Sequence, residues 1–241
     1  DHPSYAGLLS GMGKLLYTLH NYSKAGDYFY TAMRIHEKKA GKNSRDYFTA
    51  LLNLRNAYQA MDSVEVINKY FKDIIPLAEK SFANDPITLA TIYQNEGLDL
   101  YHKKNYAAAE KMLLKGLKLR ETYVGRYNQS YTEMLGNLAN FYSLTQQPNK
   151  AQKQYLKYAD HMLNYLVKQY PSMSEKDKNA LLSTNTLSIE DFKHFAIQQA
   201  SKSSVLFNKL FTFNTITKGL TLSFAKKMRS LILQSKDTTS L

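Results

Sequence analysis

Met12-Gly13-Lys14-Leu15-Leu16 opens a pattern that recurs along the first two thirds of the chain. Steps of 42 residues from Leu16 reach Tyr58, Leu100 and Tyr142. A second series in the same register holds small or apolar residues: Ala25, Ile67, Ala109 and Ala151. A fixed period of this size, kept over four copies without insertion or deletion, is typical of a solenoid built from stacked structural units.

Each copy has the apolar spacing of two helices separated by a turn. In the first copy, apolar residues recur at intervals of three and four over residues 5–19, and a second helix is predicted over residues 22–39. In the second copy, Pro76 is expected to kink or shorten the second helix, because proline lacks an amide hydrogen. The chain is therefore predicted to be all-α.

Glycine has two predicted roles in these copies. Gly13 is expected to let the second helix approach the first, with Met12 and Leu16 facing that second helix. Gly41 is expected to end the second helix with a left-handed conformation, and Gly125 has the same place two copies later. Both roles depend on the missing side chain of glycine.

Composition excludes several classes of site. The 241 residues include no cysteine, which excludes disulfides and cysteine-based metal or nucleophile chemistry in this sequence. Six histidines are scattered without the spacing of a metal motif: His2, His20, His36, His102, His161 and His194. We therefore predict no catalytic residue, no metal and no cofactor. No apolar run reaches the roughly 18 residues of a membrane-spanning helix, so no membrane partner is expected. A cytoplasmic location is a separate expectation.

The positive charge is concentrated in one part of the chain. The formal net charge is +12, but residues 1–100 carry 11 basic and 11 acidic side chains. Residues 101–170 carry 11 basic and 4 acidic side chains. This excess is consistent with a solvated basic face, with docking on an acidic neighbour, or with nucleic acid bound indirectly or weakly.

The residue order within each copy resembles the tetratricopeptide repeat. A small residue, a turn and then an Ala–aromatic–small series are the shared features, and the 42-residue period resembles the longer repeats of kinesin light chains. His2-Pro3 resembles the end of a loop between two such repeats, which implies a further repeat before Asp1. The resemblance implies a superhelix of four repeats over residues 1–160, followed by a helical capping or adaptor segment over residues 161–241.

The C-terminal segment carries a second resemblance. Residues 213–223 resemble the segment that joins the repeats of bacterial TPR–CHAT proteins to a caspase-like CHAT peptidase domain. This implies a peptidase domain beyond Leu241, with its catalytic residues outside this sequence. Within the adaptor, Ser174 and Ser188 are each expected to open a helix. The adaptor residues toward that domain are then Lys218, Gly219, Leu220, Lys226, Lys227 and Arg229.

A polar series lies on the predicted first helices, opposite their core positions. Stacked helices would align it along the concave groove of the superhelix. Asparagine is a poor helix former, but its amide both donates and accepts, which suits an extended peptide backbone. Kinesin light chain-type repeats resemble this arrangement. The alternative is that the amides hydrogen-bond between neighbouring repeats. The predicted groove residues are Lys14, Tyr17, Asn53, Asn56, Gln59, Asn95, Tyr101, Asn137 and Asn140.

These features predict a non-enzymatic module that binds a peptide or protein in its groove and couples this binding to its own downstream CHAT domain. One alternative is an assembly scaffold without protease coupling. A second is a nucleic-acid or ribonucleoprotein partner bound through the basic C-terminal half.

Overall fold

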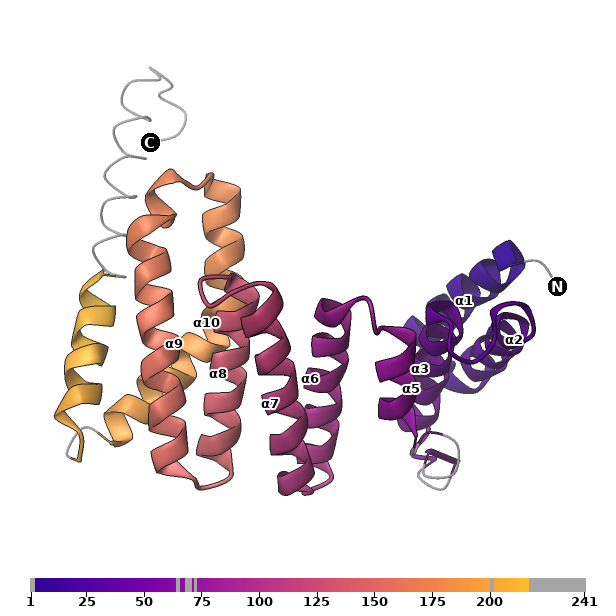
Figure 1. Ribbon diagram of the computed structural model, residues 1–241, viewed down its shortest axis with the longest axis horizontal. Coiled ribbons are helices and arrows are strands. Elements are labelled where there is room, and N and C mark those ends of the chain that lie inside the picture. Colours follow the sequence, from indigo (N-terminus) through magenta and orange to yellow (C-terminus); the bar gives the residue numbers. More distant parts are fainter. Residues whose placement is uncertain (1–2, 64–65, 68–70, 72, 200–201, 217–241) are drawn as a thin grey trace, which may run out of the picture. The chain divides into compact units, whose positions relative to one another are not determined.

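The computed structural model describes residues 3–63, 66–67, 71, 73–199 and 202–216, and these residues form helices and no strand. They fall into two compact units, Asp1–Tyr93 (unit 1) and Gln94–Leu241 (unit 2), and the boundary lies within helix α6 (Pro86–His102). Figure 1 labels the helices of both units. The all-α fold predicted from the sequence is confirmed.

Unit 1 is built from consecutive helices that pack in sequence order. They are α1 (Pro3–Thr18), α2 (Tyr22–Ala40), α3 (Arg45–Ala60), α5 (Ile74–Ser81) and the first half of α6. Helix α2 contacts both α1 and α3, and Phe29, Phe48 and Leu54 lie in the shared core. Pro76 lies in the first turn of α5, so the second helix of this copy is short, as predicted.

Unit 2 continues the same alternation and ends in longer helices. It contains the second half of α6, α7 (Tyr106–Tyr123), α8 (Gln129–Leu144), α9 (Pro148–Lys168), the 3₁₀ turn η1 (Tyr170–Ser172), α10 (Glu175–Gln198) and a helical stretch over residues 204–216. Its core includes the buried rings of Tyr155, Tyr158, Phe192 and Phe213.

One predicted boundary in unit 2 is wrong. Ser174 does cap α10, since its hydroxyl accepts from the amide of Asp177. Ser188 does not open a new helix, because α10 continues through it to Gln198. The apolar face of α10 continues across this point with Leu181 and Ile189 both buried, so packing on the core overrides the capping preference of serine.

The 42-residue period is repeated in the backbone itself. Among the residues that the structure describes, four non-glycine residues adopt positive φ, each in the turn after a first helix: His20 (59°), Asp62 (54°), Lys104 (59°) and Gln146 (57°). Asparagine follows this residue in two copies, and Asn21 and Asn105 cap α2 and α7 through their side chains. The second-helix ends repeat as well, since Gly41 and Gly125 both have positive φ as predicted.

Gly13 allows close packing between α1 and α2. A Cβ atom at this position would lie 2.6 Å from Cε1 of Phe29, whose side chain is only 2% exposed. Gly97, two copies later, has the same relation to Leu113, whose Cγ would lie 2.8 Å from an added Cβ. The predicted role of Gly13 is therefore confirmed.

The prediction that Met12 faces the second helix is wrong. Met12 is 41% exposed, and it belongs to an exposed apolar row with Tyr5, Leu8, Leu15 and Leu19. In the next copy, the counterpart of Leu15 is Ala57, which is buried and lies 3.9 Å from where a Cβ of Gly26 on α2 would be. Residues at this position of the repeat therefore contact the second helix of the preceding copy. In α1 the same position faces solvent. Leu16, by contrast, is partly buried against the core.

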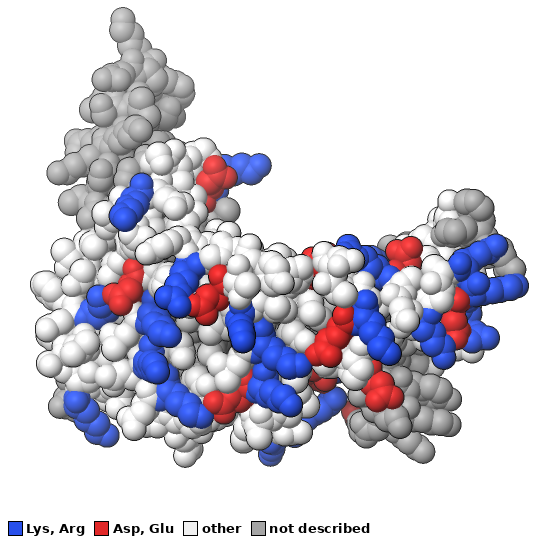
Figure 2. All heavy atoms as spheres, viewed as in Figure 1, with Lys and Arg blue, Asp and Glu red and all other residues white. Residues whose placement is uncertain are grey.

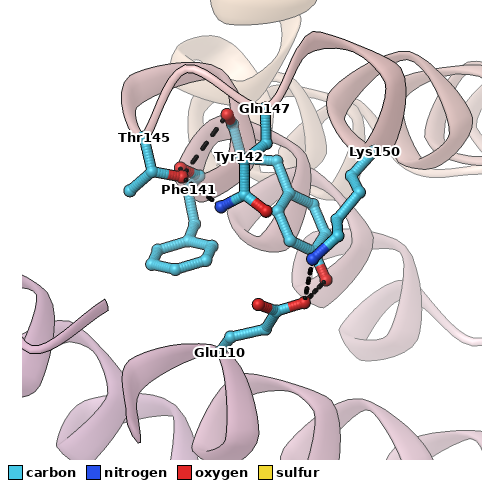
Figure 3. Close-up of polar contacts among 6 residues, drawn as sticks. All are labelled: Glu110, Phe141, Tyr142, Thr145, Gln147 and Lys150. Atoms are coloured by element: carbon cyan, nitrogen blue, oxygen red, sulfur yellow. Dashed lines mark hydrogen bonds and ion pairs between the residues drawn. The ribbon is translucent and has the colours of Figure 1, made fainter. Parts of the chain in front are cut away.

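A polar contact joins three helices of unit 2. Glu110 on α7 accepts hydrogen bonds from the Tyr142 hydroxyl of α8 and from the Lys150 Nζ of α9, each at 2.7 Å. Figure 3 shows both donors converging on one carboxylate oxygen. Burial raises the pKa of Glu110, but the bonds from Lys150 and Tyr142 and the Lys150 charge outweigh it, so the pKa lies below its ordinary 4.5.

The two glycines of α1 give a matched test of close packing. Gly13→Ala is expected to lower the free energy of unfolding by about 1–3 kcal/mol, because the new methyl group meets the buried Phe29 ring. Gly11→Ala is expected to raise it by about 0.5–1 kcal/mol, because no atom lies within 4 Å of an added Cβ and alanine favours the helix. Urea unfolding of both variants measures this. Equal effects at the two positions would contradict the packing role.

Glu110→Gln is expected to destabilise unit 2 by about 1 kcal/mol at neutral pH, because a charged acceptor of two bonds is lost. The folded-state pKa of Glu110 is depressed, so its stabilisation is present above the unfolded pKa and is lost as pH falls through the lower folded value. The difference from wild type should therefore shrink below pH 4.5. Glu190→Gln, which breaks an exposed pair with Lys193, is the control and should change stability by less than about 0.5 kcal/mol. A difference that persists in acid would contradict the assignment.

Candidate functional site

Four of the predicted groove residues line one pocket in unit 1. Lys14 and Tyr17 come from α1, and Asn53 and Asn56 come from α3, one 42-residue copy later. The pocket has a volume of about 280 Å³ and is completed by Thr18 and Phe29. Helices α1 and α3 contact each other as well as α2, so their exposed polar faces border the same hollow.

The floor and the rim of this pocket differ in chemistry. Phe29 reaches it from α2 after passing beneath Gly13, so the absence of a side chain at Gly13 also places an aromatic ring under the pocket. The rim carries the exposed ammonium group of Lys14 and two amides. Tyr17 is held by an edge-to-face contact with Tyr22, with ring centroids 5.1 Å apart. The pocket thus offers an apolar floor with a polar, positively charged rim.

The rim amides have no partner among the described residues. Asn53 is half-buried and Asn56 is exposed, and neither side chain forms a hydrogen bond with any part of the chain that the structure describes. Lys14 likewise forms no ion pair within those residues. The donors and acceptors on this rim are therefore not satisfied by the described residues.

The other predicted groove residues lie elsewhere. Gln59 is half-buried near the end of α3 and does not line this pocket. In unit 2, the side chains of Asn95, Asn137 and Asn140 also form no hydrogen bond among the described residues. Tyr101 packs its ring edge-on against Phe141, with centroids 6.1 Å apart. The adaptor residues Lys218, Gly219, Leu220, Lys226, Lys227 and Arg229 lie outside the described residues.

Sequence reasoning did not identify Phe29 or Thr18 as pocket residues. Phe29 is a core residue that also lines the pocket. The signal in the sequence that could have identified Phe29 as a pocket residue is its place opposite Gly13. Glycine has no side chain that could cover the ring beneath it. Thr18 lies one helical turn after Lys14 on the exposed side of α1.

Other kinds of site find no support in the part of the chain that the structure describes. It holds no group of three or more His, Asp or Glu side chains placed to bind a metal ion. Every described helix is too short or too polar to cross a lipid bilayer. The strongest pKa changes are those of Tyr142, Tyr155 and Tyr158, raised mainly by burial, which marks them as packed core residues.

Comparisons with known proteins agree with this fold. A tetratricopeptide-repeat family model matches residues 89–128, which span most of α6 and all of α7. No curated protein sequence matches the chain.

Solved structures resemble it over longer stretches. The crystal structure of BtubC (BKLC) from P. vanneervenii is similar, with a TM-score of 0.58 and 17% sequence identity. The similarity covers 68% of this chain and 66% of that chain, so this chain spans just under two thirds of the length of BtubC. Tetratricopeptide-like repeats of a kinesin light chain from Podospora anserina are similar with a TM-score of 0.55 and 13% identity, over 91% and 98% of the two chains. The apo form of RapI is similar with a TM-score of 0.52 and 16% identity, over 95% and 86%. The chain therefore has the fold of a tetratricopeptide-like α-solenoid.

Proposed function

We propose that this chain is a protein-interaction module that holds an extended peptide or protein segment on the pocket between α1 and α3. The observation that carries this proposal is the unpaired state of Asn53 and Asn56 on the rim. The fold by itself does not define a function, because one fold hosts many. The proposal of peptide binding therefore rests on the chemistry of the pocket.

The pocket chemistry suits an extended chain. A strand-like segment presents one donor and one acceptor per residue, and an asparagine amide can satisfy both. Phe29 offers an apolar surface for one side chain of the ligand, while Lys14 favours an acidic residue beside it. Two asparagines in the middle of a helix cost stability relative to alanine, so their presence on α3 is better explained by binding than by folding.

Asn53→Ala combined with Asn56→Ala tests this proposal. The double variant is expected to bind a peptide selected from a library on the wild-type protein about tenfold more weakly, since each lost bond is worth about 0.5–1.5 kcal/mol. Its free energy of unfolding should stay equal or rise by a few tenths of a kcal/mol, because alanine is the better helix former. Calorimetric titration and urea unfolding measure the two quantities.

Asn43→Ala with Asn84→Ala is the matched control, because both asparagines are exposed in turns of unit 1 and lie away from the pocket. It should leave affinity unchanged. Loss of stability in the pocket variant would favour the alternative, in which the amides bond within the protein. Unchanged affinity in both variants would remove the pocket from the binding site.

We further propose that the segment after residue 160 couples this binding to a downstream CHAT peptidase domain. The support is the sequence resemblance of residues 213–223 and the basic series that follows it. A ligand that favours one arrangement of the helices would then shift the adaptor between two states. A plain assembly scaffold, with binding but no coupled peptidase, is the competing interpretation.

Removal of residues 161–241 from the natural full-length protein is the test of coupling. Ligand control of peptidase activity on a peptide substrate should be lost, while ligand binding by the repeats persists. Control that survives the deletion would rule out coupling through this segment. A full-length protein without a peptidase domain would leave the scaffold interpretation.

A further inference from the structure

Two rows of lysine lie on the second helices of unit 2. Their spacing of three and four residues keeps each row on one face of its helix. Lys153 stands 42 residues after Lys111, and Lys157 stands 42 residues after Lys115, so the rows occupy the same place in successive copies. Figure 2 shows basic side chains gathered over α7 and α9. The rows are Lys111, Lys115 and Lys118 on α7, and Lys150, Lys153 and Lys157 on α9.

The two rows belong to one surface. Lys150 of α9 forms an ion pair with Glu110 of α7 at 2.7 Å, so the two helices run close enough for their side chains to meet. Lys111, Lys118, Lys153 and Lys157 are all exposed on these two helices. We call these four residues the lysine face.

The acidic residues near this surface already have partners. Glu110 binds Tyr142 and Lys150, and Asp160 on α9 binds Lys209 at 2.5 Å. Glu121 at the far end of α7 pairs with Arg126. The four members of the lysine face form no ion pair within the part of the chain that the structure describes. Their positive charge is therefore not neutralised by those residues.

The fold does not require lysine at these positions. The residues of α2 that correspond to Lys111, Lys115 and Lys118 are Asp27, Thr31 and Arg34. Helix α2 is nonetheless a regular second helix that packs on both its neighbours. The same structural element thus occurs in this chain without lysine at these three positions, so packing of a second helix does not require lysine there.

The composition of the lysine face distinguishes between two kinds of anionic partner. Protein interfaces are depleted in lysine and depend on buried aromatic or apolar anchors. Between Lys111 and Lys118 and between Lys150 and Lys157, the only aromatic residue is Tyr155, which is buried, and Leu114 alone is a large exposed apolar residue. Phosphate contacts on nucleic acid need only positive charge and no anchor.

We propose that the lysine face binds the phosphate backbone of nucleic acid without reading its sequence. This inference goes beyond the peptide-binding proposal, because it concerns second helices of unit 2 and different chemistry. Positive charge in rows along helices is the electrostatic footprint expected of such binding. Lysines that contact phosphates release counterions, so the affinity must fall steeply as salt rises.

The test uses the whole chain and a fluorescent single-stranded RNA of about 30 nucleotides, titrated at about 50 and 200 mM salt. Lys111→Gln, Lys153→Gln and Lys157→Gln together should weaken binding at least about tenfold and lower the salt slope by about 2. The matched control removes the same charge from exposed lysines of unit 1: Lys24→Gln, Lys39→Gln and Lys80→Gln. It should have a clearly smaller effect.

A charge-conserving variant separates charge from folding. Lys111→Arg, Lys153→Arg and Lys157→Arg should bind RNA like the wild type, whereas the glutamine variant should not, although both keep wild-type helicity. Three results would overturn the proposal: no RNA binding by the wild type at the lower salt, equal losses in the lysine-face and control variants, or equally tight binding of polyglutamate of similar charge. The last result would assign the face to an acidic protein instead.

Discussion

This structure depends on the contact between a glycine of one helix and a buried side chain of the next helix. Phe29 lies under Gly13, and Leu113 lies under Gly97 two copies later. Each contact brings a first and a second helix together and thereby sets which face of the first helix remains outside. The polar rim residues Lys14 and Asn56 lie on that outer face, so the pocket is a product of the same packing.

Much of this fold could be predicted from the sequence because period and turn chemistry are local signals. The 42-residue register predicted where the turns fall, and Gly41 and Gly125 have the predicted positive φ. Burial depends on neighbours that a local pattern does not contain. Met12 has the apolar spacing of a core residue, yet it lies at a position of the repeat that is buried only when a second helix precedes it. Ser188 has a capping sequence, yet packing extends α10 through it.

The candidate site was predictable in the same partial way. Helical periodicity was sufficient to place Lys14, Tyr17, Asn53 and Asn56 on one face, and these four line one pocket. It could not show that Phe29 forms the floor, because that depends on how deeply a ring from another helix reaches. Nor could it show whether the amides are already paired, since hydrogen bonds between helices depend on distances that no sequence spacing records.

The turn residues His20, Asp62, Lys104 and Gln146 share a positive φ although their side chains differ in size and charge. The helices on either side must therefore impose the conformation, and the residue itself accepts it. The same type of turn therefore connects the two helices in each copy. Whole 42-residue copies can accordingly be gained or lost in evolution, while the outer surface of each copy changes independently, as at the position that holds Asp27 in α2 and Lys111 in α7.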